Sequence, residues 1–387
     1  MRPDTLRRVF DACVIVMFLG ALSGSWADMF WHLDPTPVPS ENRATAKWPA
    51  LSGRPAGTTP FAIAVADYFY DHFGFRRLLL TWHGAFRLWV GESPSSRVLL
   101  GRGGWLFYAG NDIVEDYLGR RPLSETDLDT WQTTIAARRA RLAQRGGAYF
   151  FAVAPDKTTI YPEFLPAGLA PRRITTFDQI AQRMTERDSP SFLTMIDDLR
   201  RAKSAAQVYY QTDTHWTIAG LQAAEMSVMA RLGRPKAASV PVASVVTIHG
   251  GDLARMLNGP ARYAETIMRS APAALTQPLG TEEALRWRDE SIGQIVTAAA
   301  VQFAGSGERD HVLMFGDSFG RDLAPYLAAR VASLTFVPMH PDAATFATLV
   351  DRFRPDLVIE ERTERYLKYP PRPAPFADRR KGWMAAE

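Results

Sequence analysis

Residues 312–318 read Val-Leu-Met-Phe-Gly-Asp-Ser, and this stretch decides the fold. Four consecutive apolar residues predict a strand that is buried on both faces, which is typical of a parallel sheet covered by helices. Gly316, Asp317 and Ser318 predict a tight turn, and we expect a helix near residues 322–330. A serine after such a strand lies at the carboxyl edge of the sheet, where α/β folds bind their ligands.

The same alternation of strands and helices extends over most of the chain. Apolar runs predict further strands at residues 149–154, 191–196, 208–211, 334–337 and 357–360. Helical periodicity predicts helices at residues 61–90, 126–145, 177–187 and 218–232. A hairpin is predicted at residues 97–108, and residues 234–310 are expected to form an insertion with short strands. The pattern indicates an α/β fold with a parallel sheet and helices on both faces.

The N-terminus carries the localisation signal. Arg2, Arg7 and Arg8 precede an uncharged, largely apolar segment at residues 12–27. Basic residues before an apolar run keep the N-terminus in the cytoplasm and send the rest of the chain across the membrane. We interpret residues 1–31 as a membrane anchor, with a cleaved signal peptide and a buried soluble helix as alternatives. Both the anchor and the signal peptide place the body of the protein outside the cytoplasm.

Composition divides the rest of the chain. Residues 32–60 contain six prolines and few large apolar side chains, which predicts an extended tether. We expect one α/β domain over residues 61–370 and a tail over residues 371–387. The net charge is +4 without a dense basic stripe, which disfavours nucleic-acid binding. Cys13 is the single cysteine, so an intrachain disulfide is excluded.

Three polar residues predict acyl-transfer chemistry. Ser318 precedes a helix whose N-terminal N–H groups and dipole can hold an oxyanion. Serine needs a base, and His215, two residues after Asp213, offers an imidazole with a carboxylate to orient it. In an extended chain both side chains point to one face. The alternatives are that Ser318 caps a helix and that Asp213 caps a helix beside a structural histidine.

Metal and nucleotide chemistry find little support in the sequence. No histidine–acid cluster has the spacing of metal ligands, and neither a Walker loop nor a Gly-x-Gly-x-x-Gly motif occurs. We therefore predict no metal and no cofactor.

Several segments in order resemble the alginate O-acetyltransferase group of SGNH-hydrolase-like proteins, whose fold is flavodoxin-like. The similar segments are Asp71-His72-Phe73-Gly74-Phe75-Arg76, Gly103-Gly104-Trp105-Leu106-Phe107-Tyr108, Ala154-Pro155-Asp156-Lys157, Tyr161-Pro162-Glu163, Asp213-Thr214-His215-Trp216-Thr217, Gly251-Asp252-Leu253, Gly316-Asp317-Ser318-Phe319 and Glu361-Arg362-Thr363-Glu364-Arg365-Tyr366-Leu367. The resemblance covers residues 65–367. Asp213, His215 and Ser318 follow one another in the order of the permuted branch of this group, whereas ordinary SGNH hydrolases place the serine near the start of the domain.

The resemblance implies a function in the periplasm. Ser318 would carry an acetyl group to a sugar hydroxyl of an exopolysaccharide, with His215 as base and Asp213 as its orienter. It also implies a multi-pass membrane acyltransferase in the inner membrane as acetyl donor. About twenty residues follow Leu367, so we expect glycan affinity to come from this domain or a partner and not from a separate carbohydrate-binding module.

Two further residues and two other functions stay open at this point. Lys157 and Arg321 are candidates for contacts to the substrate or the acetyl carbonyl, with surface salt bridging as the alternative. The same triad would serve a carbohydrate acetyl esterase, which transfers the acetyl group to water. A non-catalytic scaffold of a polysaccharide export complex would keep the fold and leave the serine inert.

Overall fold

The computed structural model describes most of the chain. The described residues are 3–34, 45–49, 60–169, 174–186, 191–234, 242–257, 263–272, 280–281, 285–289, 294–298, 300–305, 307 and 310–371. Much of the predicted tether and nearly all of the predicted tail lie outside them. The chain forms two compact units, one made of Met1–Val98 with Asp252–Tyr263 and the other of Leu99–Gly251 with Ala264–Glu387.

The second unit is built on a seven-stranded sheet in the order β4-β3-β13-β11-β12-β10-β7. Its strands are β3 (Ala148–Ala154), β4 (Phe192–Thr194), β7 (Gly280–Thr281), β10 (Val301–Ala304), β11 (His311–Phe315), β12 (Ser333–Val337) and β13 (Leu357–Thr363). The strands from β4 to β12 run parallel, whereas β10 and β7 extend one edge in antiparallel pairing. In the centre, β11 lies between β13 and β12 and pairs with both, so the strand that leads to Ser318 is enclosed on both sides.

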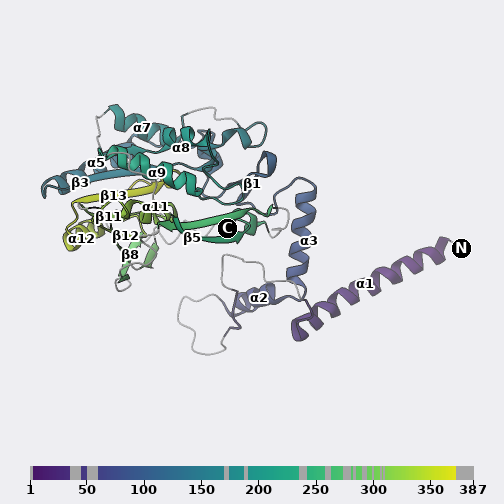
Figure 1. The fold of residues 1–387 in the computed structure, drawn as a ribbon. Helices are drawn as coiled ribbons and strands as arrows, with labels where there is room; N and C mark the ends of the chain where they lie inside the picture. Colours follow the sequence, from purple (N-terminus) through teal and green to yellow (C-terminus); the bar gives the residue numbers. More distant parts are fainter. Residues whose placement is uncertain are drawn as a thin grey trace. The chain divides into compact units, whose positions relative to one another are not determined.

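Helices cover both faces of the sheet (Figure 1). The helices of this unit are α4 (Ile113–Tyr117), α5 (Glu125–Ala143), α6 (Lys157–Ile160), α7 (Thr176–Glu186), α8 (Ile196–Lys203), α9 (Ile218–Arg231), α11 (Ser318–Ala328) and α12 (Ala343–Phe353). Alternate residues of a strand point to opposite faces, and β11 shows the result. Phe315 packs on Phe346 of α12, while Met314 lies under Gly320 of α11 on the other face.

Local signals explain the helix ends. Ser124 and Asp127 form a capping box at the start of α5, and the Thr217 side chain accepts the N–H of Gly220 at the start of α9.

A two-stranded sheet of β1 (Val98–Leu100) and β2 (Leu106–Tyr108) confirms the predicted hairpin. The insertion contains two further ribbons, β5 (Val242–His249) with β6 (Thr266–Pro272) and β8 (Leu285–Asp289) with β9 (Gln294–Ala298).

The first unit contains α1 (Pro3–Trp31), α2 (Phe61–His72), α3 (Arg76–Trp89) and α10 (Asp252–Met256). The helical region predicted at residues 61–90 is therefore confirmed, with a break where Phe75 adopts a left-handed conformation (φ 58°). Among the described residues, Arg7–Trp31 of α1 is the one helical stretch that is long and apolar enough to cross a membrane.

Two predicted elements differ in the structure. Residues 208–211 form no strand; a single bridge between Tyr209 and Trp216 closes a loop there. A strand forms only where a neighbouring strand pairs with it, and an apolar run in the sequence does not show whether such a partner exists. The helix expected from residue 322 begins at Ser318, because Asp317 and not a later residue caps it.

Candidate active site

Ser318 is the first residue of α11, directly after the turn that ends β11. The Asp317 carboxylate caps the helix, since its Oδ1 accepts the Phe319 N–H at 2.9 Å. Ser318 itself donates no backbone hydrogen bond within the described part of the chain, as expected for one of the four free N–H groups at a helix start. That N–H is therefore available to a ligand beside the serine hydroxyl.

Two carboxyl groups, that of the buried Glu361 and that of the partly buried Asp317, hold this turn to the neighbouring strand β13. Asp317 Oδ2 accepts the backbone N–H and the hydroxyl of Thr363 at 3.0 and 2.6 Å. Glu361 Oε2 accepts the Asp317 N–H at 3.2 Å. Gly316 and Gly320 are needed here, because a Cβ at either position would lie 2.6 Å from that same Glu361 oxygen. The turn is thus packed against a carboxyl group that leaves no room for a side chain.

The two carboxyl groups differ in their charge. Burial raises the pKa of Glu361 well above its usual range, and the nearby Asp317 carboxylate raises it further. Burial opposes the charge of Asp317 as well, but His340, Thr363 and Phe319 together hold the pKa of Asp317 below its usual range. Nε2 of His340 lies 3.7 Å from Oδ2, which is too long for a hydrogen bond. We conclude that Asp317 is the ionised member of the pair at neutral pH.

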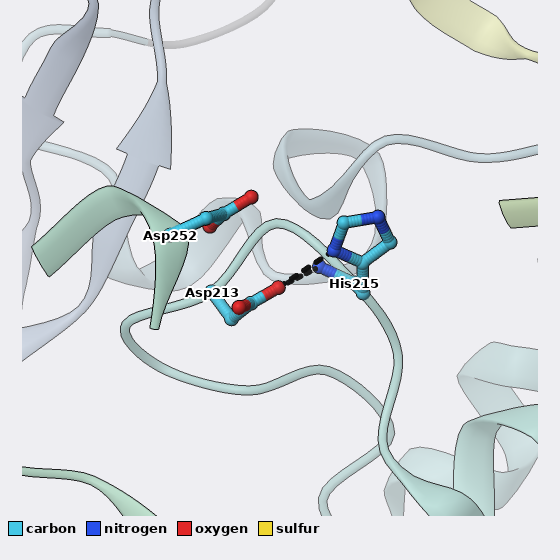
Figure 2. A group of neighbouring side chains, drawn as sticks. All are labelled: Asp213, His215 and Asp252. Carbon is cyan, nitrogen blue, oxygen red and sulfur yellow. Dashed lines mark hydrogen bonds and ion pairs between the residues drawn. The ribbon is translucent and has the colours of Figure 1, made fainter. Parts of the chain in front are cut away.

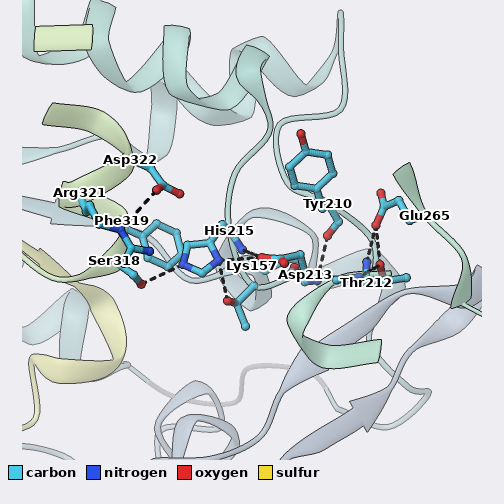
Figure 3. A network of polar contacts seen from close by, with 12 residues as sticks. Lys157, Tyr210, Thr212, Asp213, His215, Glu265, Ser318, Phe319, Arg321 and Asp322 are labelled. Atoms are coloured by element: carbon cyan, nitrogen blue, oxygen red, sulfur yellow. Dashed lines mark hydrogen bonds and ion pairs between the residues drawn. The ribbon is translucent and has the colours of Figure 1, made fainter. Parts of the chain in front are cut away.

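His215 connects Ser318 to Asp213. His215 Nε2 lies 2.9 Å from Ser318 Oγ (Figure 3), and His215 Nδ1 lies 2.7 Å from Asp213 Oδ1 (Figures 2 and 3). With the Nδ1 proton donated to the carboxylate, Nε2 is left to accept the serine proton. The ring also packs 5.0 Å from the Phe319 ring, which limits its rotation. The structure brings together the three side chains that the sequence predicts as a triad.

The geometry of Asp213 and His215 arises in a different way from the one expected. Residues 211–215 are a series of bends and not an extended strand. Asp213 Oδ1 accepts the backbone N–H of His215 at 3.0 Å as well as the ring Nδ1. Aspartate commonly bonds the backbone two residues ahead in this way. A local turn, and not strand alternation, therefore aims the carboxylate at the imidazole.

Two charged side chains from elsewhere hold this loop (Figure 3). Lys157 Nζ at the start of α6 donates to the carbonyls of Tyr210, Gln211 and Asp213 at 3.0, 3.1 and 2.8 Å. Glu265, just before β6, accepts the N–H groups of Gln211 and Thr212 at 2.9 and 2.7 Å and the Thr212 hydroxyl at 2.8 Å. A cation thus binds the carbonyls and an anion binds the amides of one short segment, which we call the base loop (residues 210–215).

A cavity of about 110 Å³ that is open to solvent lies beside His215. Its wall is mostly apolar and carries one charged pair, Arg321 and Asp322, from α11. The lining residues are Tyr210, Asp213, His215, Trp216, Leu221, Ile267, Met268, Arg321, Asp322 and Pro325. The Arg321 side chain is 58% exposed, and its Nε lies 3.8 Å from Asp322 Oδ1, so it can reach a ligand. A ligand in this cavity would contact the imidazole of His215, the base of the candidate triad.

The other residues singled out from the sequence have separate positions. Arg321 lines the cavity, whereas Lys157 is 5% exposed and directs its Nζ to three backbone carbonyls. Sequence reasoning gave no role to Glu265, Glu361 or Thr363. For Glu361 a signal was present, since an acidic residue in the same strand just after the apolar run 357–359 must find buried partners. Glu265 lies in a loop that no pattern connects to the base loop.

Comparisons with known sequences point to one family. The family model described as "SGNH hydrolase-like domain, acetyltransferase AlgX" matches residues 98–330, a range that contains Asp213, His215 and Ser318. A protein of Pseudomonas aeruginosa named a probable alginate O-acetylase AlgJ is 27% identical over 264 residues. The match covers 66% of this chain and 62% of that relative, so the chain spans less than two thirds of the relative's length. Its Pseudomonas putida counterpart is 29% identical over 141 residues, 35% of this chain and 34% of that relative.

Two solved structures are similar at lower identity. The O-acetyltransferase domain of Pseudomonas putida AlgJ aligns with a TM-score of 0.46 at 18% identity, covering 71% of this chain and 93% of that one. Bacillus cereus PatB1 aligns with a TM-score of 0.47 at 12% identity, covering 70% of this chain and 96% of that one.

Proposed function

Since the chain belongs to the family of SGNH hydrolase-like domains described for the acetyltransferase AlgX, we propose that it is a serine-dependent O-acetyltransferase of the periplasm. Its acceptor would be a hydroxyl group of an exopolysaccharide. The observation that carries the proposal is the hydrogen-bonded chain from Ser318 Oγ through His215 to Asp213, with distances of 2.9 and 2.7 Å. This is the arrangement that makes a serine hydroxyl nucleophilic.

The first half-reaction would load the acetyl group onto Ser318. His215 Nε2 takes the hydroxyl proton while Ser318 Oγ attacks the acetyl carbonyl carbon, and the negative charge moves to the carbonyl oxygen. The Ser318 N–H at the start of α11 supports this role, because it can donate to that oxygen together with the helix dipole. When the tetrahedral intermediate collapses, the donor leaves with the proton that His215 held, and an acetyl-serine ester remains.

The second half-reaction would run the same steps with a sugar hydroxyl. His215 removes the proton of the acceptor hydroxyl, whose oxygen attacks the ester carbonyl, and the proton returns to Ser318 Oγ as the acetylated sugar leaves. Asp213 stabilises the imidazolium in both halves without itself taking a proton. Water in place of the sugar would make the protein an esterase, so the acceptor site decides the outcome.

The cavity beside His215 would hold the acceptor. Its apolar wall suits the face of a sugar ring, and Arg321 offers a charged hydrogen-bond donor at the rim. We expect Arg321→Ala to raise the KM for an oligosaccharide acceptor about tenfold and to leave the acetylation of Ser318 by a small acetyl ester unchanged. An unchanged KM for the acceptor would remove Arg321 from the binding site.

The localisation and the donor belong to the same proposal. Helix α1 would tether the domain to the inner membrane with the domain on the periplasmic side, as the preceding arginines suggest. The resemblance of the sequence to the alginate O-acetyltransferase group implies that the acetyl group is delivered from the cytoplasmic side of the membrane. A multi-pass membrane acyltransferase that carries the acetyl group across is therefore the proposed partner.

Replacing Ser318 with alanine tests the proposal. We expect Ser318→Ala to lower acetyl transfer to an oligosaccharide by at least about 10³-fold while the thermal unfolding curve stays unchanged. The wild-type protein should also form an acetyl-serine adduct of about 42 Da that the variant lacks, a mass that corresponds to an acetyl group replacing a proton. Acetyl transfer by the folded variant would exclude the serine mechanism, and acetate released equally with and without acceptor would identify an esterase.

A further inference from the structure

Helix α3 of the first unit has an exposed apolar stripe. Leu79, Trp82, Phe86 and Trp89 follow one another at steps of three and four residues, so they share one face of the helix. Their exposed fractions are 50%, 66%, 60% and 78%. The opposite face is the packed one, since Gly84 and Leu88 are buried. We call the four exposed residues the α3 stripe.

Basic residues accompany the α3 stripe on one side. Arg76 and Arg87 lie along the same edge of the helix, and the helix contains no acidic residue. A helix with Trp, Phe and Leu on one face and basic residues on the polar face is typical of segments that lie in the interface of a membrane. Large aromatic side chains prefer that depth, because their rings are apolar at one end and polar at the other.

The start of α3 is fixed to the end of α1. Asp28, in the last turn of α1, accepts the Phe75 N–H at 2.7 Å, and Asp34 accepts the Leu78 N–H at 3.3 Å. The backbones also touch, because a Cβ on Gly74 would lie 1.9 Å from the Ser25 carbonyl oxygen. The first turn of α3 is therefore held at the level where α1 would leave the bilayer.

From these observations we infer that α3 lies in the outer interface of the membrane that α1 crosses, with the α3 stripe in contact with lipid. The attachment to α1 identifies the occupant: the apolar phase nearest to the stripe is the bilayer itself. The inference rests on the proposed anchoring by α1 and adds a second membrane contact to it. Such a contact would hold the first unit against the membrane instead of letting it swing on a single helix.

Nitroxide labels on the full-length chain test the inference. The protein is reconstituted in vesicles of phosphatidylethanolamine and phosphatidylglycerol, with a label on Leu79→Cys in a Cys13→Ser background. Two further proteins serve as references. One carries the label on the native Cys13 in α1, and the other carries it on Ala136→Cys, at an exposed position of α5, in the Cys13→Ser background. Collision with oxygen, which concentrates in lipid, is compared with collision with a water-soluble nickel chelate.

We expect the label at position 79 to favour oxygen over nickel, as at Cys13, and the label at 136 to favour nickel. The pair Trp82→Ser and Trp89→Ser, added to Leu79→Cys, should move the label at 79 toward nickel. A label at 79 that behaves like the one at 136 while Cys13 is in lipid overturns the inference and leaves the anchor intact. Protection from both reagents also overturns it and indicates a protein on the stripe. Nickel access at Cys13 would show that the anchoring by α1 is itself wrong, whatever Ser318 does.

Discussion

The turn that carries Ser318 lies between a central strand and a helix, whereas the base loop that carries Asp213 and His215 has no regular secondary structure over residues 210–215. The position of the serine turn is set by β11, which pairs with strands on both sides. The base loop pairs with no strand along its length. Its backbone contacts are the bridge between Tyr209 and Trp216 at its base and single hydrogen bonds such as the one from Leu106 N–H to the Gln211 carbonyl at 2.9 Å. Its shape depends also on Lys157 and Glu265, which bind its carbonyls and amides.

The difference shows two ways of placing a reactive group. A strand and a helix place the serine through backbone hydrogen bonds that the whole sheet reinforces. Two side chains of opposite charge place the histidine by satisfying backbone groups that would otherwise be buried without partners. Substitutions near the serine should therefore act mainly on the free energy of unfolding, and substitutions near the histidine mainly on kcat.

The sharpest test of this contrast uses the same chemical change on both sides. Asp213→Asn keeps the size of the side chain but removes the charge that orients His215 and stabilises its imidazolium. We expect kcat for acetyl transfer to fall about 10⁴-fold, as when the acid of other serine triads is replaced by asparagine. The free energy of unfolding should change by less than about 1 kcal/mol, because the amide oxygen can still accept the His215 backbone N–H.

Asp317→Asn is the matched control. An amide at this position can satisfy Phe319 or Thr363 with its one oxygen but not both, so it leaves a buried donor without a partner. We expect a loss of about 2 kcal/mol in the free energy of unfolding and a much smaller fall in kcat than for Asp213→Asn. Equal losses of kcat in the two variants would contradict the division of roles.

Breaking the support of the base loop should have the next largest effect. Lys157→Met keeps the length of the side chain but removes the three hydrogen bonds to the loop carbonyls. We expect kcat to fall about 10²-fold with little change in the KM for the acceptor, because misplacing a base by about 1 Å costs that much. Steady-state kinetics on the folded variant measure both quantities.

Lys203→Met provides the comparison for Lys157→Met. Lys203 also donates to a backbone carbonyl, that of Ile160 at 2.6 Å, and pairs with Glu163, but it forms no hydrogen bond or ion pair with the base loop residues 210–215. It should cost some stability and leave kcat unchanged. If the two lysine variants lower kcat alike, the effect of Lys157 is one of general stability and not of positioning.

The same contrast explains what the sequence could predict. The serine turn was predictable because its signal is local: an apolar run, a tight turn and a helix within about twenty residues. The chemistry of Asp213 and His215 was readable from residue types, but their surroundings were predicted as a strand that does not exist. The sequence makes Lys157 a candidate for substrate contact, whereas in the structure its Nζ donates to the carbonyls of the base loop.

Long-range partners account for what the sequence did not reveal. Glu265 lies more than fifty residues along the chain from Gln211 and Thr212, whose N–H groups donate to it. Glu361 lies 44 residues from Asp317, whose N–H donates to it. Contacts over such separations leave no periodic trace in the chain. The start of α11 was misplaced for a simpler reason, since the cap is Asp317 and Ser318 is already helical.

The smallest effect on activity is expected from Glu361→Gln, which tests the serine side alone. Burial and the Asp317 carboxylate raise the pKa of Glu361 well above its usual value and so favour its neutral form. A neutral amide at this position should therefore leave kcat nearly unchanged. Stability should respond to pH. A raised pKa in the folded state stabilises the protein fully below the unfolded pKa of about 4.5, and this stabilisation is lost as pH rises toward the folded pKa. Urea unfolding between about pH 5 and pH 7 should therefore show a fall in the wild-type free energy that is smaller in the variant. Parallel curves for the two proteins would mean that Glu361 is ionised beneath the turn. An ionised Glu361 would then hold the serine turn, as the charged Lys157 and Glu265 hold the base loop.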